Sequence, residues 1–441
     1  MILNKNYLNI NKASQFFTFI LLLVFTPLTE AAAVTNGQFP FGVFDKSDPY
    51  DKFDKKPYLV GSNEWLTYRK EFVKILLKYN INTVINTPYK NDKHARTVLD
   101  HLHKNQINVI FQPGNPFNRK NDIATPGYAE NSIYRHPSII AYKLWDEPKT
   151  QKKLDKLKIW YSLIENHYDK PIITAMIGEL MGESKTGKQL KIKGGDNDIS
   201  LTAWQRLDSE ILFARHYPLR RTYDLINWYD DKMKMPFHEW CAYMETAYKD
   251  KPWWYIPPLF GKGKEKSHKS YWRFPTSNEI NVLIHTALAN GARGIIGWGI
   301  PTYDYSRKKT RKMFIDESLQ LETARDGSIP MEQYGRIGEL TKTHASLLLR
   351  HKRSNIQLIE SNDNVLKVPR VDPETSDLYV YTVNLNTVES KQTSFIISKN
   401  KNITTAVDIY SNKKLNVAIT EDGTKVSYLL SPGEALFVQL K

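Results

Sequence analysis

Short apolar runs alternate with longer amphipathic stretches between residues 34 and 352 of the chain. Most of the runs are rich in Ile, Val and aromatic residues and end in Gly, Pro, Asn or Asp, which is typical of buried parallel strands. Eight strands are predicted on this basis: 39–45, 81–89, 107–114, 139–148, 171–178, 210–218, 252–261 and 292–300.

The stretches between the predicted strands repeat apolar residues at helical spacing. Helices are predicted over 63–80, 95–106, 153–168, 221–233 and 276–294. In the last of these, Thr276 or Ser277 is the expected N-cap, and Gly291 marks the expected end.

Eight strand–helix units predict an α/β fold, a (β/α)8 TIM barrel within residues 34–352. An open, doubly wound sheet is the alternative. It is disfavoured because eight units are the number that closes a barrel. In addition, no Gly-rich dinucleotide-binding motif follows the first predicted strand.

The pattern changes after residue 352. The apolar runs there alternate or are β-branched, and no helical pattern is evident; the runs are 377–385, 392–398, 405–411, 424–430 and 434–440. Turn signals such as Asp422-Gly423 and Pro432-Gly433 separate them. Residues 353–441 are therefore predicted to form a small antiparallel β-sandwich. Its expected role is to support the barrel, and direct sugar binding is the alternative.

Residues 1–33 have the pattern of an export signal. Lys5 and Lys12 precede an apolar stretch at 16–25, and the small residues at 31–33 offer a cleavage site. The apolar stretch is too short to span a bilayer. We therefore expect a signal peptide that is removed and a secreted or periplasmic protein without a membrane anchor.

Charge adds information about the partner. The chain has 62 Lys and Arg against 47 Asp and Glu, a formal net charge of +15, which favours a polyanionic ligand.

Cys241 is the only cysteine, so an intramolecular disulfide is excluded. No metal-binding motif and no serine-hydrolase motif occurs, so neither a metal nor a cofactor is expected. The oligomeric state stays open.

The candidate chemistry lies where the predicted strands end, because barrel enzymes carry their sites at the carboxyl ends of the strands. The fourth predicted strand ends in "WDEP" at 145–148, with adjacent carboxylates at Asp146 and Glu147. This ending resembles the glycoside hydrolases of clan A and their relatives, in which strand 4 ends in Asn-Glu-Pro or a variant. The resemblance extends to 273–299, with an R-x-P-T start and a G-A-x-G before the last barrel strand, and to "SPGEALFVQL" at 431–440.

The resemblance implies that Glu147 is the general acid/base and that Asp146 holds a sugar hydroxyl. Cleavage of a glycosidic bond needs a proton for the leaving oxygen, and a Glu kept protonated near neutral pH supplies it. An adjacent ionised Asp would raise the pKa of that Glu. A strand-ending turn with two exposed acids is the alternative interpretation.

The resemblance does not extend to the second catalytic group. Clan A enzymes place a nucleophilic Glu at the end of strand 7, whereas the run at 252–261 has no carboxylate. Acids after other strands, namely Asp45, Glu179 and Asp304, are candidates for a nucleophile or a base. A substrate-assisted mechanism resembling that of hexosaminidases, with Asp146 positioning a 2-acetamido group, is an alternative. A non-catalytic glycan-binding barrel and, more remotely, a lyase using Tyr and His are the others.

The predicted loops after the fifth to eighth strands are rich in Lys and Arg, notably over 185–193, 215–221, 262–273 and 307–312. Such a rim would attract an anionic ligand, and Arg binds sulfate or carboxylate oxygens in a forked geometry. No nucleic-acid-binding module and no helix with a continuous basic stripe is present. An acidic polysaccharide or oligosaccharide, sulfated or uronate-containing, is therefore the predicted partner, and nucleic acid is not.

Aromatic and polar residues at the strand ends complete the predicted site. Aromatic rings there can stack on sugar rings, amides can bind hydroxyls, and basic groups can bind anions. The predicted substrate-binding residues are Asp45, Asn86, Gln112, Trp145, Arg215, His216, Tyr217, Trp254, Arg273, Trp298 and Tyr303. Glu147, Asp146, Glu179 and Asp304 are the predicted catalytic residues. The sequence as a whole predicts a secreted glycoside hydrolase of an acidic glycan.

Overall fold

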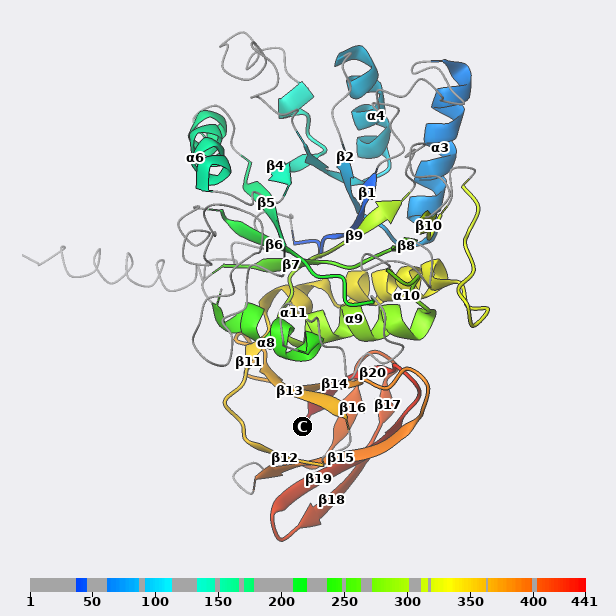
Figure 1. Cartoon of the computed structure of the whole chain (residues 1–441). Coiled ribbons are helices and arrows are strands. Elements are labelled where there is room, and N and C mark those ends of the chain that lie inside the picture. Colours follow the sequence, from blue (N-terminus) through cyan, green and yellow to red (C-terminus); the bar gives the residue numbers. More distant parts are fainter. Residues whose placement is uncertain are drawn as a thin grey trace, which may run out of the picture.

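The computed structural model (Figure 1) describes residues 37–45, 62–86, 92–112, 133–146, 151–165, 170–177, 209–219, 236–247, 251–262, 272–300, 311–315, 319–361, 364–398 and 403–441. The predicted signal peptide at 1–33 and the predicted helix at 221–233 lie outside these residues. None of the helices in the described ranges is long and apolar enough to cross a membrane.

Eight parallel strands form a closed barrel in which the first and last strands pair with each other. The barrel strands are β1 (Phe41–Asp45), β2 (Thr83–Asn86), β3 (Asn108–Phe111), β4 (Ile139–Asp146), β5 (Ile172–Ile177), β6 (Ile211–Arg215), β7 (Trp253–Ile256) and β9 (Ile295–Ile300). Each lies within one of the eight predicted runs. The predicted TIM barrel is confirmed, and the open doubly wound sheet is wrong.

Helices surround the barrel (Figure 1). They are α3 (Asn63–Lys78), α4 (Asp92–Lys104), α6 (Gln151–Glu165), α8 (Phe237–Ala247), α9 (Ser277–Ala289), α10 (Pro330–Thr343) and α11 (Ala345–Arg350), with a short 3-10 turn, η1 (Ile133–Arg135). The predicted start of α9 is confirmed, because the Thr276 side chain accepts a hydrogen bond from the Glu279 backbone N–H in a capping box. Helix α8 follows β6 and contains the buried Cys241.

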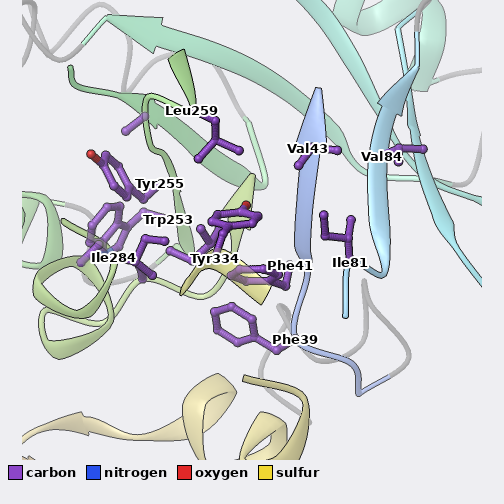
Figure 2. Close-up of a cluster of buried hydrophobic side chains, with 14 of the residues drawn as sticks. Phe39, Phe41, Val43, Ile81, Val84, Trp253, Tyr255, Leu259, Ile284 and Tyr334 are labelled. Carbon is purple, nitrogen blue, oxygen red and sulfur yellow. The ribbon is translucent and has the colours of Figure 1, made fainter. Parts of the chain in front are cut away.

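Buried apolar side chains fill both faces of the barrel strands. One cluster lies between the strands and the surrounding helices, and Figure 2 shows part of it. There the Tyr334 hydroxyl of α10 donates to the Gly42 carbonyl of β1 at 2.5 Å and accepts from the Gly297 N–H of β9 at 3.2 Å. A second cluster lies inside the barrel and includes Phe44 and Phe213. Successive residues of most barrel strands alternate between the two clusters. In β4 the successive residues Ile140 and Ala141 both belong to the inner cluster, at an irregularity in the pairing with β3.

The chain after the barrel forms two antiparallel sheets, which confirms the predicted β-sandwich. The six-stranded sheet has the order β11 (Lys352–Arg353), β13 (Val365–Val371), β14 (Leu378–Asn384), β20 (Ala435–Leu440), β16 (Ala406–Asp408) and β17 (Lys413–Lys414). The four-stranded sheet has the order β12 (Leu358–Glu360), β15 (Lys391–Ser398), β19 (Gly423–Leu430) and β18 (Asn416–Thr420). A separate apolar cluster is buried between the sheets. A two-stranded ribbon of β8 (Phe260–Lys262) and β10 (Arg311–Met313) lies outside the barrel sheet.

The sandwich packs on the helix layer, with α9 between it and the barrel (Figure 1). The His285 Nδ1 of α9 lies 2.6 Å from the Tyr381 hydroxyl of β14. Near the start of α9, the Asn278 side chain donates to the Thr387 carbonyl at 3.0 Å. Arg370 of β13 is fully buried and forms an ion pair with Glu245 of α8. These contacts fit the expected supporting role of the sandwich.

Candidate active site at the carboxyl end of the barrel

The parallel strands bring their carboxyl ends together at one end of the barrel, where barrel enzymes carry their sites. Four predicted site residues, Glu147, Glu179, Tyr303 and Asp304, lie outside the described residues. Three others are placed by their backbone: Asn86 ends β2, and Trp145 and Asp146 end β4.

The end of β4 is irregular. Leu144 pairs with Thr174 of β5, but Asp146 pairs with Ala175, so Trp145 is an extra residue in the ladder. Such bulges are frequent beside active sites. The simple alternation of side chains that the sequence suggested therefore cannot be extended from Leu144 through the carboxylates.

A lysine lies inside the barrel. The Lys143 side chain is 0% exposed, and its backbone pairs with Ile173, which belongs to the interior cluster. Its Nζ donates to the Gln112 Oε1 at 3.4 Å and lies 5.6 Å from the centroid of the Phe44 ring. The sequence prediction missed Lys143, although a single Lys within the apolar run at 139–145 was a detectable signal.

Aromatic rings gather on the opposite strands of the same barrel end. The ring of Phe260 lies 5.1 Å from Trp298, 5.3 Å from Tyr217 and 6.0 Å from Trp272, centroid to centroid. Trp298 and Trp272 are partly exposed. Trp298 and Tyr217 were predicted, whereas Phe260 and Trp272 were missed. Phe260 lies near the end of the seventh predicted strand, and Trp272 lies beyond that strand.

A basic side chain accompanies these rings. The Arg215 guanidinium at the end of β6 lies 4.9 Å from the centroid of the Tyr217 ring, and Arg215 is partly exposed. A guanidinium held over an aromatic face makes a favourable cation–π contact. Gln112, just after β3, is also partly exposed. The structure therefore places the partly exposed Gln112, Arg215 and Trp298 at this end of the barrel, whereas Tyr217 lies there as a buried residue, 8% exposed.

Asp45 is placed differently from the expectation. Its two carboxylate oxygens accept hydrogen bonds from the Arg69 guanidinium of α3 at 3.1 and 2.6 Å, and the two side chains are only 0% and 3% exposed. Asp45 follows the inward Phe44, so its side chain lies on the outer face of the strand, beneath α3. It is a structural ion pair, and the roles of substrate ligand and second catalytic acid are not supported for it.

Three further predicted ligands are also part of the packing. Trp254 is 0% exposed and lies inside the barrel, edge-to-face with Phe213, because it points inward below the strand end. His216 is buried on the outer face of its strand, 4.9 Å from the Trp240 ring of α8. Arg273 is buried in an ion pair with Glu279, within the capping network of α9. None of the three has the exposed surface that a ligand contact requires.

Among the described residues, several of the groups with shifted pKa values lie in packing layers. Burial raises the pKa of Tyr255 and of Cys241, both between the barrel and α8. Burial lowers the pKa of His285, between α9 and the sandwich, to about 3. Among the described residues, no group of His, Cys, Asp and Glu could hold a metal ion.

No known protein family and no curated protein sequence matches the chain. Among solved structures, one described as a glycoside hydrolase superposes with a TM-score of 0.50 at 10% identity, over 84% of this chain and 88% of that one. An α-L-fucosidase from Bacteroides thetaiotaomicron gives a TM-score of 0.46 at 14% identity, over 93% and 95% of the two chains. The α-fucosidase of Thermotoga maritima in complex with fucose gives 0.39 at 9% identity, over 98% and 86%. At the level of fold, the predicted (β/α)8 barrel followed by a C-terminal sheet domain is confirmed.

Proposed function

We propose that this chain is an exported glycoside hydrolase of an acidic glycan, with Glu147 as the general acid/base. The observation that carries the proposal is the end of β4. This strand of a closed parallel barrel ends at Asp146, immediately before Glu147 in the sequence, on the side where barrel enzymes act. The similarity of fold to a solved structure described as a glycoside hydrolase supports the same reaction class.

In this reaction Glu147 protonates the leaving oxygen while positive charge develops on the sugar ring. Asp146 holds a hydroxyl of the same sugar. A second carboxylate attacks the sugar directly or activates a water molecule, and its distance from Glu147 decides between retention and inversion. Because Arg69 neutralises Asp45, Glu179 and Asp304 remain the candidates for this second role.

The acidic substrate is supported by charge and by the rings at the barrel end. The chain carries a formal net charge of +15. Arg215 is partly exposed beside Tyr217, where its donors can reach a sulfate or a carboxylate. Partly exposed Trp298 offers a stacking surface for a sugar ring. A ring surface combined with nearby cations suits an anionic saccharide.

A glycan-binding protein without hydrolytic activity is the second candidate. The observation that favours it is the end of β7, where Ile256 is followed by two prolines and residues 251–262 contain no carboxylate. The nucleophile position of the enzymes that the sequence resembles is therefore vacant in this stretch. Such a protein would use the same rings and cations to bind without cleaving.

The test compares the wild type with Glu147→Gln on a panel of sulfated and uronate-containing polysaccharides. Released reducing ends report hydrolysis, and ultraviolet absorbance reports the unsaturated products of a lyase. We expect release by the wild type and none by Glu147→Gln, with binding retained. Glu332→Gln, the same change at an exposed position of α10, is the matched control and should behave as wild type. Equal release by all three proteins removes Glu147 from the mechanism, and binding without release by any of them favours the binding protein.

A further inference from the structure

Lys143 is unusual for the place it occupies. Barrel interiors are generally filled by branched apolar side chains, and residues of the interior cluster such as Ile85, Ile110 and Ile173 follow that rule. Removing an ammonium group from water is costly unless other groups compensate. A lysine kept at 0% exposure in this position therefore calls for a role that an apolar residue could not fill.

Two contacts of the ammonium group, with the Phe44 ring and the Gln112 amide, bear on its local role. Its Nζ lies over the face of the Phe44 ring, 5.6 Å from the centroid, within the distance of a cation–π contact. It donates to the Gln112 Oε1 at 3.4 Å. An ammonium group has donors and no acceptor, so only the oxygen of the Gln112 amide can face it. The amide nitrogen, with its two N–H donors, is consequently directed away from Lys143.

Gln112 lies where the orientation of its amide can affect ligand binding. It is the first residue after β3, it is partly exposed, and it lies at the carboxyl end of the barrel. If the amide were free to rotate, it could offer either its oxygen or its nitrogen to a ligand. With its oxygen bound to Lys143, it offers donors. A donor suits sulfate and carboxylate oxygens, which only accept hydrogen bonds, and the buried positive charge behind it adds to the attraction.

We propose that Lys143 is a positioning residue that fixes Gln112 as a hydrogen-bond donor and thereby selects an anionic oxygen, of a sulfate ester or a uronate, on the bound sugar. The inference rests on the proposed function for the acidic nature of the glycan and adds the residues that recognise its charge. Lys143 acts through Gln112 and through its charge. Gln112 makes the contact.

The experiment measures binding, in the Glu147→Gln background so that no substrate is consumed. Dissociation constants are determined for two matched pairs of oligosaccharides: a sulfated form with its desulfated counterpart, and a uronate form with its carboxyl-reduced counterpart. The preference for the anionic member of each pair is the readout, and the pair with the larger preference identifies the anion. Measurements of kcat/KM on the same pairs, without the Glu147 change, give the corresponding preference in catalysis.

Lys143→Met replaces the ammonium by an apolar group of similar length, which suits the barrel interior. It should reduce the anionic preference by about 10- to 100-fold, the range for losing one hydrogen bond to a charged group. Gln112→Glu keeps a partner for Lys143 but removes the donors, so it should abolish the preference as well. Lys143→Arg keeps a donor facing Oε1 and should retain most of it. Lys74→Met, which removes one positive charge at an exposed position of α3, is the control and should leave it unchanged.

A Lys143→Met protein that keeps the wild-type preference overturns the inference. So does a wild type that binds both members of each pair equally, or that binds none of the four ligands. The proposed function fails separately. If the protein prefers the anionic members through Lys143 but never cleaves them, hydrolysis is refuted and the inference stands. If it cleaves acidic glycans and Lys143→Met leaves the preference intact, only the inference is refuted.

Discussion

The buried ion pair between Asp45 and Arg69 offers a direct way to separate structure from catalysis. Asp45→Asn keeps the shape of the side chain but removes the carboxylate charge that faces the Arg69 guanidinium, which is only 3% exposed. Breaking a buried pair from one side costs about 3–5 kcal/mol. At about 2 °C per kcal/mol, the lower figure for a domain of 150–250 residues, the melting temperature should fall by roughly 6–10 °C.

Two companion variants calibrate this loss. Asp45→Leu combined with Arg69→Met removes both charges and replaces them with apolar groups, so most of the lost stability should return. Glu71→Gln breaks the ion pair with Lys74 on the same helix, where the side chains are 51% and 71% exposed. Exposed pairs contribute about 0–1 kcal/mol, so the melting temperature of Glu71→Gln should stay within about 2 °C of wild type.

The assay combines differential scanning calorimetry with hydrolysis, measured at a temperature well below every melting point. If Asp45 is structural, Asp45→Asn melts early but retains its activity per folded molecule. An Asp45→Asn protein with the wild-type melting temperature and no activity would refute the structural role. Asp45 would then again be a candidate catalytic residue.

Three other predictions follow from the same placements. Trp298→Ala should raise KM by on the order of tenfold with little change in melting temperature. Trp254→Ala should instead lower the free energy of unfolding by about 3–5 kcal/mol, because it leaves a cavity. The reverse pattern in kinetics and calorimetry would contradict the assignment of Trp298 to the site and of Trp254 to the core. His285 is neutral in the folded protein because burial lowers its pKa to about 3, while the unfolded chain protonates it below about 6.5. The free energy of unfolding should therefore fall by up to about 1.4 kcal/mol per pH unit below 6.5. His285→Gln should flatten the dependence of melting temperature on pH between about 6.5 and 5. Equal slopes for His285→Gln and wild type would argue against a contribution from His285. Arg370→Met removes one of the two arginines that pair with the Glu245 carboxylate at the sandwich contact, so it should lower the melting temperature. An unchanged melting temperature in calorimetry would exclude a stabilising role for the Arg370–Glu245 pair.

The fold could be predicted because its signal is repeated. Eight apolar runs of strand length, each followed by a chain segment long enough for a helix, leave few alternatives to a closed barrel. The turn signals after residue 352 likewise predicted the sandwich. Both predictions depend on the type of the elements and not on the direction of any side chain.

The site was harder because it depends on direction. Barrel strands are buried on both faces, so an apolar pattern does not tell which residues point inward. Asp45 and His216 sit at strand ends as predicted, but both point outward and pack beneath α3 and α8. Trp254 points inward but lies too deep. The extra residue at Trp145 interrupts the alternation of side chains in β4, and no feature of the sequence predicted this bulge.

One residue of known direction resolves the directions of its neighbours along a strand as far as the next bulge. In a parallel ladder, paired residues point to the same side, so the inward Ile173 assigns Lys143 to the interior and Tyr142 and Leu144 to the helix side. Lys143 is itself a sequence signal for the direction of β4. A charged residue in the middle of an apolar run is costly to bury, so it is expected where a polar partner exists. In a barrel whose strands are apolar on both faces, such a residue marks an inward position near a polar site more specifically than the acids and aromatic residues at the strand ends.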